Sequence, residues 1–190
     1  MLLKPDYPTL SALVGVLGAC LALPALAGVV RPAWVGVLCN RFPRAKIPGY
    51  VLSVVTMVWT ALWIPIMLQE FIPGRAASLF PFVQIFVPVA IAALIFVLPE
   101  LLSCRTAGLL FVLLPAPLLS AAQWHPSGWR LVVVVSAYVF AVAGMFIVAR
   151  PWYLRDALFF CNRTVSRTRA FSLGVFVWGL VLFVLSVVEY

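Results

Sequence analysis

Residues 131–149 read LVVVVSAYVFAVAGMFIVA and contain no charged side chain. Arg130 and Arg150 stand directly at the two ends of this stretch. A helix of these 19 residues rises about 28 Å, which matches the roughly 30 Å hydrocarbon core of a bilayer. The stretch therefore predicts a membrane-spanning helix with a cation at each headgroup layer.

The composition of the whole chain extends this interpretation. Of its 190 residues, 65% are apolar or aromatic and 9% are charged, whereas a soluble domain carries about a quarter charged residues. This excludes a soluble globule, and no alternating pattern favours a β-barrel. We predict an all-α integral membrane protein, a bundle of six transmembrane helices in one domain of residues 1–190. The expected spans are 8–30, 50–68, 78–98, 106–122, 131–149 and 170–188.

The cations are distributed unevenly between alternate connections. Ten of the 13 Lys and Arg residues follow spans one, three and five, while Lys4, Arg75 and Arg130 fall on the other side. The positive-inside rule then predicts both termini outside and the basic loops in the cytoplasm, in a plasma membrane that we expect to be a bacterial inner membrane. The ten are Arg31, Arg41, Arg44, Lys46, Arg105, Arg150, Arg155, Arg163, Arg167 and Arg169.

An internal repeat is indicated by the two asparagines of the chain. Asn40 and Asn162 both lie in Cys-Asn-Arg, and Arg-Pro precedes each motif, at 31–32 and at 150–151. We predict helix hairpins at 8–68 (repeat 1), 78–122 (middle hairpin) and 131–188 (repeat 2). Because four spans separate equivalent positions, the two repeats are expected to be parallel.

The basic loops also carry aromatic residues. Pro151 is a normal first residue for a short helix lying in the membrane interface, and Trp34, Trp152 and Tyr153 are expected to be interfacial anchors. Anionic phospholipids are natural partners for such loops, although topology alone also accounts for the cations. The candidate headgroup ligands are Arg31, Arg41, Arg44, Lys46, Arg150, Arg155, Arg163, Arg167 and Arg169.

Polar residues and helix breaks inside the spans are few. Gln84 is expected to form an interhelical hydrogen bond, with ligand contact as the alternative. Pro115 and Pro117 predict a kink or unwound turn in span four, which can mark a substrate site but is also common in membrane helices.

The residues that usually perform chemistry are sparse. His125 is expected in an interfacial loop, with a proton-handling or metal role as the alternative. The four cysteines lack metal-site spacing, so we expect packing roles, or lipid modification of Cys39, Cys104 and Cys161. The acids lie near span ends, where Glu100 with Arg105 and Asp156 with Arg155 are expected ion pairs. This pattern predicts no catalytic residues, no metal and no cofactor, and it disfavours ion-coupled transport.

Two functions remain open from the sequence. The first is a non-catalytic subunit that scaffolds or seals a larger membrane complex, contacts other integral membrane subunits and binds lipid through its basic loops. The alternative is a small transporter or lipid-handling protein with its site at the Pro-broken spans three and four. The isoelectric point near 10.0 reflects orientation in the membrane, so nucleic acid is not expected as a partner.

Overall fold

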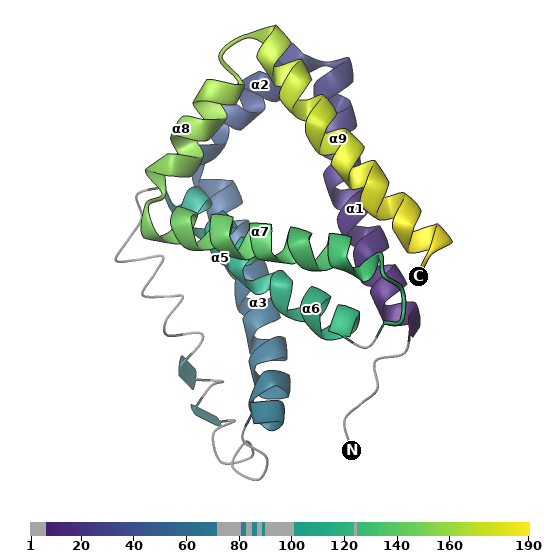
Figure 1. Cartoon of the computed structure of the whole chain (residues 1–190). Coiled ribbons are helices and arrows are strands. Elements are labelled where there is room, and N and C mark those ends of the chain that lie inside the picture. Colours follow the sequence, from purple (N-terminus) through teal and green to yellow (C-terminus); the bar gives the residue numbers. More distant parts are fainter. Residues whose placement is uncertain (1–6, 72–80, 83–84, 87–88, 90–100, 124) are drawn as a thin grey trace.

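The computed structural model describes residues 7–71, 81–82, 85–86, 89, 101–123 and 125–190. Within these residues the named elements are all helices, arranged as Figure 1 shows. They are α1 (Tyr7–Val30), α2 (Pro32–Arg41), the 3-10 helix η1 (Phe42–Arg44), α3 (Lys46–Phe71), α5 (Leu102–Leu113), α6 (Pro115–Gln123), α7 (Arg130–Ala149), α8 (Trp152–Cys161) and α9 (Val165–Val188).

Four helical stretches of the described chain are long and apolar enough to cross a bilayer: Leu10–Val30, Leu102–Gln123, Arg130–Ala149 and Val165–Val188. The chain is therefore a helical integral membrane protein, as its composition predicts. Helix α3 covers the expected span 50–68, whereas span 78–98 and Gln84 fall largely or wholly outside the described residues. The count of six spans stays a prediction.

Helices α1 and α9 form the most extensive contact in the described fold, and small residues allow their close approach. A Cβ atom on Gly18 would lie 2.7 Å from the backbone nitrogen of Phe183, so only glycine fits there. The Ser11 hydroxyl donates to the Ser186 carbonyl oxygen at 2.6 Å. These pairs place the start of α1 beside the end of α9, so the two helices run antiparallel.

A second glycine contact joins α5 to α7. A Cβ atom on Gly144 would lie 2.7 Å from the backbone nitrogen of Val112, and one on Gly108 would lie 2.8 Å from Ile147. Helix α5 ends at Leu113, and α6 begins at Pro115, so the break expected in span four is present. In the most apolar part of Leu102–Gln123, 50% of the residues are buried, against 22% in that of Leu10–Val30. Helices α5 and α6 are therefore the central helices of the described bundle.

The two basic loops form similar local structures. The backbone turns at Arg31 (φ −127°, ψ 64°) and at Arg150 (φ −137°, ψ 81°), and a helix of 10 residues follows each turn. The short helix expected after Pro151 is α8, and its position in the membrane interface stays a prediction. The Asn162 amide closes it by donating to the Leu158 carbonyl oxygen at 2.9 Å.

The packing of the long helices differs from the expected hairpins of consecutive spans. Helix α1 packs mainly on α9, and α3 packs mainly on α5, although α1 and α3 flank one basic loop. The physical reason is the placement of small residues, since Gly18 faces α9 and Gly49 faces α5. The parallel repeat itself stays a prediction.

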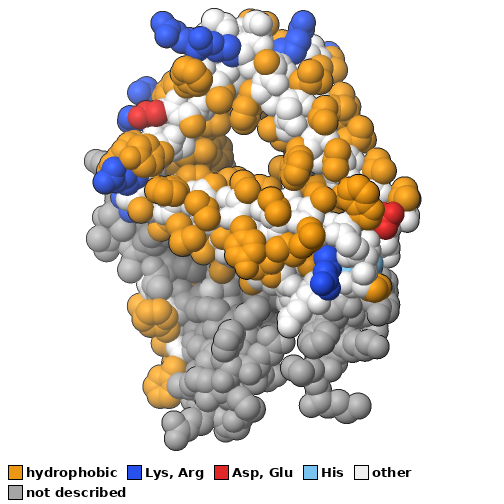
Figure 2. Space-filling view, in the orientation of Figure 1, with side chains coloured by type: hydrophobic (Ala, Val, Ile, Leu, Met, Phe, Trp, Pro, Cys, Tyr) orange, Lys and Arg blue, Asp and Glu red, His pale blue; other side chains and the backbone are white. Residues whose placement is uncertain are grey.

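The helix ends gather into two groups. The ends that carry most of the described cations meet where η1 and α8 contact α5 and α2 contacts α8. The other group includes Ser127 and Glu189, which are joined by a hydrogen bond of 3.2 Å. In Figure 2, apolar side chains cover α7, α8 and α9, Lys and Arg cluster at the ends of α8, and an opening passes between these helices. The loops expected on one side of the membrane therefore lie together.

Candidate functional site

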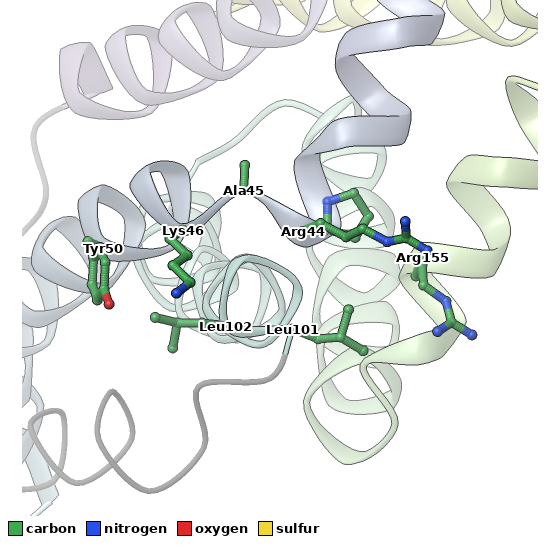
Figure 3. Close-up of a pocket in the computed structure, with 8 residues that line it drawn as sticks. Arg44, Ala45, Lys46, Tyr50, Leu101, Leu102 and Arg155 are labelled. Carbon is green, nitrogen blue, oxygen red and sulfur yellow. The ribbon is translucent and has the colours of Figure 1, made fainter.

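A pocket with a volume of about 430 Å³ lies where the two basic loops meet the start of α5. We call it the cationic pocket, because three of its eight described lining residues are Lys or Arg (Figure 3). The lining residues are Pro43, Arg44, Ala45, Lys46, Tyr50, Leu101, Leu102 and Arg155.

The first wall is the junction between η1 and α3. Pro43 is buried in η1, and Arg44 is the last residue of this short helix. Ala45 is extended (φ −78°, ψ 121°), and α3 then begins at Lys46. Tyr50 stands one turn after Lys46, on the same side of α3, as Figure 3 shows. The chain thus presents two cations and a phenol within seven residues.

The second wall is the start of α5. Leu101 has a left-handed backbone (φ 55°), which is unusual for a residue other than glycine, and α5 begins directly after it. The Ser103 hydroxyl donates to the Ala45 carbonyl oxygen at 2.5 Å. A Cβ atom on Gly49 would lie 3.1 Å from the backbone nitrogen of Ser103. These contacts hold the start of α5 against the start of α3.

The third wall is Arg155 of α8, more than a hundred positions after Arg44 in the chain. Its Nε donates to the Asp156 carboxylate at 2.8 Å, so the expected ion pair is present. Both partners are well exposed, and such a pair stabilises the fold by at most about 1 kcal/mol. The pair occupies Nε, and the two terminal nitrogens of Arg155 take no part in it.

This arrangement suits an anion. The described lining holds three cations and no carboxylate. Lys46 and Leu102, the first residues of α3 and α5, are part of the lining, and the N-terminal end of a helix carries a partial positive charge. Arginine and lysine are the usual ligands of phosphate oxygens, whereas Pro43, Leu101 and Leu102 offer apolar contact. The pocket can bind a phosphate that is attached to an apolar group.

The other predicted headgroup ligands lie outside the lining of this pocket, and they are exposed, as Arg44 and Lys46 also are. Arg150 donates to the Tyr153 hydroxyl at 2.8 Å and lies over its ring, and Arg167 lies over the Phe160 ring at 4.9 Å. The expected interfacial anchors Trp34, Trp152 and Tyr153 are exposed, as interfacial anchors need to be. The remaining exposed cations are Arg31, Arg41, Arg163 and Arg169.

The residues proposed for a site at the helix break do not line the cationic pocket. Pro115 and Pro117 are buried in α6. Gln84 and Glu100 lie outside the described residues.

His125 is buried rather than displayed in an open loop. Its ring meets the Tyr190 ring edge-on at a centroid distance of 4.9 Å, and its Nδ1 accepts from the Ser127 N–H at 3.3 Å. In the part of the chain that the structure describes, no three His, Cys, Asp or Glu residues are grouped as a metal site requires.

The cysteines differ in accessibility. Cys104 is completely buried, so acylation there would require the α5 contacts to open. Cys39 and Cys161 are half-buried, and burial raises the pKa of the Cys39 thiol. A protonated thiol is a poor nucleophile, so Cys39 is disfavoured as a reactive group at neutral pH.

The sequence did not indicate Tyr50, Leu101 or Leu102 as site residues. Tyr50 has the detectable signal of standing four residues after Lys46 at the start of a span. Leu101 and Leu102 reach the pocket through contacts between distant segments and have no such signal. No protein-family model, curated protein or solved structure matches this chain, so the cationic pocket is the basis for its proposed function.

Proposed function

We propose that this protein is a non-catalytic membrane subunit that binds anionic, phosphate-bearing lipid headgroups in its cationic pocket. One observation carries the proposal. Arg44, Lys46 and Arg155 come from two loops far apart in the chain, and they line one pocket of about 430 Å³ with apolar residues beside them. Topology explains cations on one side of a membrane, but it does not require cations from distant loops to line one cavity.

The physical chemistry of a lipid headgroup fits these walls. Each Lys or Arg near an anionic membrane surface contributes about 1 kcal/mol of attraction. The Tyr50 hydroxyl can donate to a phosphate oxygen, and the side chains of Leu101 and Leu102 can contact the glycerol backbone and the first acyl carbons. By the positive-inside rule we place the pocket at the cytoplasmic leaflet, both termini outside and the protein in a bacterial inner membrane.

The second part of the proposal is assembly with other integral membrane subunits. Its support is the large helix surface that no other part of the described chain covers. In the most apolar part of Val165–Val188, only 22% of the residues are buried. A second, apolar hollow of about 340 Å³ lies between α1, α7 and α9, and Phe140, Phe171, Gly174 and Trp178 are among its lining residues. Close helix packing in lipid uses small residues beside large ones, as this surface offers.

Lipid binding is tested by removing the three cations of the pocket together. In Arg44→Gln/Lys46→Gln/Arg155→Gln, we expect phosphatidylglycerol and cardiolipin adducts to fall at least about tenfold in native mass spectrometry of the detergent-solubilised protein. The matched control is Arg163→Gln/Arg167→Gln/Arg169→Gln, which removes three exposed cations outside the pocket lining and should change binding less than about twofold. Equal losses in the two variants would contradict a specific site.

Assembly is tested by gentle extraction from the native membrane. We expect the protein to migrate with at least one other integral membrane polypeptide, identified by mass spectrometry of the purified fraction. A stable monomer without any companion polypeptide would refute the subunit role and leave the lipid site standing. The transport alternative gains no comparable support, since Pro115 and Pro117 pack inside the bundle.

A further inference from the structure

The described lining of the cationic pocket is unbalanced in charge. Arg44, Lys46 and Arg155 each carry a positive charge, and the exposed Asp156 carboxylate pairs with one of the three, Arg155. Among the described residues, this leaves an excess of about two positive charges at the pocket. A phosphodiester headgroup carries one negative charge, while a phosphomonoester carries about 1.5 to 2 near neutral pH.

The directions of the cationic side chains add a geometric argument. They enter from three elements, with Arg44 at the end of η1, Lys46 at the start of α3 and Arg155 on α8. In Figure 3, Lys46 points toward Leu102 beside Tyr50, whereas Arg44 and Arg155 extend toward the other side of the pocket. Positive charge on both sides of the pocket favours a ligand with more than one negative charge, as a terminal phosphate has and a phosphodiester has not.

The size and the apolar wall indicate that the phosphate is attached to a larger group. A volume of about 430 Å³ is within the range of pockets for whole small molecules, which is roughly 300–1,000 Å³. Leu101 and Leu102 line one part of it and offer no hydrogen-bonding side chain. A lipid places a phosphate and an apolar body side by side, as these walls do.

We infer that the cationic pocket selects a lipid whose headgroup ends in a phosphate monoester over a lipid whose phosphate is a diester. The inference rests on the proposed lipid-binding function and narrows its ligand. A lipid and a soluble phosphate compound can both carry a terminal phosphate, and we assign the pocket to the lipid.

The experiment compares two lipids with the same acyl chains. Dioctanoyl phosphatidic acid carries a terminal phosphate, and dioctanoyl phosphatidylglycerol carries a diester. Native mass spectrometry of the full chain in an uncharged detergent should give an affinity about tenfold higher for phosphatidic acid near pH 7.5. The preference should disappear in Arg44→Gln/Lys46→Gln/Arg155→Gln and persist in Arg163→Gln/Arg167→Gln/Arg169→Gln.

The pH dependence of the affinity ratio provides a second readout. The second proton of a phosphate monoester binds near pH 6, so the ratio should fall to within about twofold by pH 5. The described charged groups at the pocket are Arg44 from η1, Lys46 from α3 and Arg155 from α8, which is paired with Asp156.

Each outcome has a distinct meaning. Equal affinities for the two lipids, both lost in the triple pocket variant, would overturn the inference and leave the proposed function intact. Affinities that do not depend on the three pocket cations would overturn both. Binding of inorganic phosphate or glycerol 3-phosphate as tight as that of phosphatidic acid would make a free phosphate compound the ligand, against our assignment to a lipid.

Discussion

Ser103 fixes the geometry of the cationic pocket without lining it. Its hydroxyl donates to the Ala45 carbonyl oxygen at 2.5 Å and joins the start of α5 to the residue between Arg44 and Lys46. The side chain is almost completely buried. A hydrogen bond in this position contributes about 1 kcal/mol and holds the segment that carries Arg44 and Lys46 against the second wall, the start of α5.

Replacing this serine should weaken lipid binding while leaving every charge in place. We expect Ser103→Ala to lower the affinity for phosphatidic acid by about threefold to tenfold. Without the hydrogen bond to the Ala45 carbonyl oxygen, the η1–α3 junction is no longer held against α5. Ser120→Ala is the control, since the Ser120 hydroxyl donates within α6, to the Pro117 carbonyl oxygen at 3.0 Å. Native mass spectrometry of both variants measures this, and equal affinity in Ser103→Ala and wild type would show that the bond does not position the site.

Tyr190 gives a pH-dependent prediction at the opposite end of the bundle. Its ring packs against His125, and its buried hydroxyl has no hydrogen-bond partner among the described residues. Burial, followed by the nearby Glu189 carboxylate, raises the pKa of Tyr190 above its usual value of 10.0. The folded state therefore favours the neutral phenol. Its contribution to stability is complete below about pH 10 and is lost as the pH rises above that value.

Thermal unfolding of wild type and Tyr190→Phe between pH 8 and pH 11 measures this effect. Near pH 8 the variant should be at least as stable as wild type and at most about 1–2 kcal/mol more stable, since the phenylalanine keeps the ring contact and removes an unpaired hydroxyl. Above pH 10 the wild type should lose more stability than the variant. Identical pH profiles would mean that the phenol ionises as easily in the folded chain as in water.

At the residue scale, the sequence identified the charged part of the site and missed its other walls. Arg44, Lys46 and Arg155 stand out because cations are rare in an apolar chain and have few explanations. Leu101 and Leu102 are two more leucines in a leucine-rich chain, and their place in the pocket depends on contacts with a distant segment. Composition alone does not show that Arg155 lines the pocket and that Arg163 and Arg167 do not.

At the scale of the element, glycines determine which helices pair. The α1–α9 contact brings Gly18 against the backbone of Phe183 and Gly179, and the α5–α7 contact brings Gly144 against the backbone of Val112. Backbones approach this closely only where no Cβ atom intervenes. In lipid there is no hydrophobic driving force between helices, so dispersion contacts at such close approaches stabilise the pair.

A single added methyl group tests the α1–α9 contact. Gly18→Ala would place its Cβ atom 2.7 Å from the Phe183 nitrogen and 2.8 Å from the Gly179 carbonyl oxygen, where backbone would have to move. We expect a loss of about 1–3 kcal/mol in stability. Gly174→Ala on α9 meets nothing within 4 Å and should stay within about 1 kcal/mol of wild type.

Melting temperatures in the same detergent compare the two alanine variants directly. A Gly18→Ala protein as stable as Gly174→Ala would contradict the close approach of α1 and α9 at this position.

The extents of the helices were more predictable than their partners. Helix α7 begins and ends within one residue of the expected span 131–149, because a long uncharged stretch between two arginines has one stable form in a bilayer. Helix α9 begins at Val165, five residues before the expected start, since its first turn contains polar residues outside an apolar window. Hairpin packing was expected from sequence order, but the close contacts depend on which small residues face each other in space.

At the scale of the whole molecule, the distribution of charge agrees with the way the helix ends are grouped. The ends around η1, α8 and the start of α5 meet, whereas Ser127, Glu189 and Tyr190 meet elsewhere. The charge bias between alternate loops predicts such a division. The cationic pocket lies within the group of helix ends that carries the basic loops. The lipid-binding proposal therefore depends on residues 44 and 155 being on the same face of the membrane.

A distance measurement across the pocket tests this claim most directly. Spin labels on Arg44→Cys/Arg155→Cys, with the native cysteines replaced and the protein in lipid nanodiscs, should report a separation well below the roughly 40 Å thickness of a bilayer with its headgroups. The control pair, Arg44→Cys/Arg130→Cys, should report a separation near that thickness. A separation of about 40 Å or more between positions 44 and 155 would place the two loops on opposite faces and contradict the shared pocket.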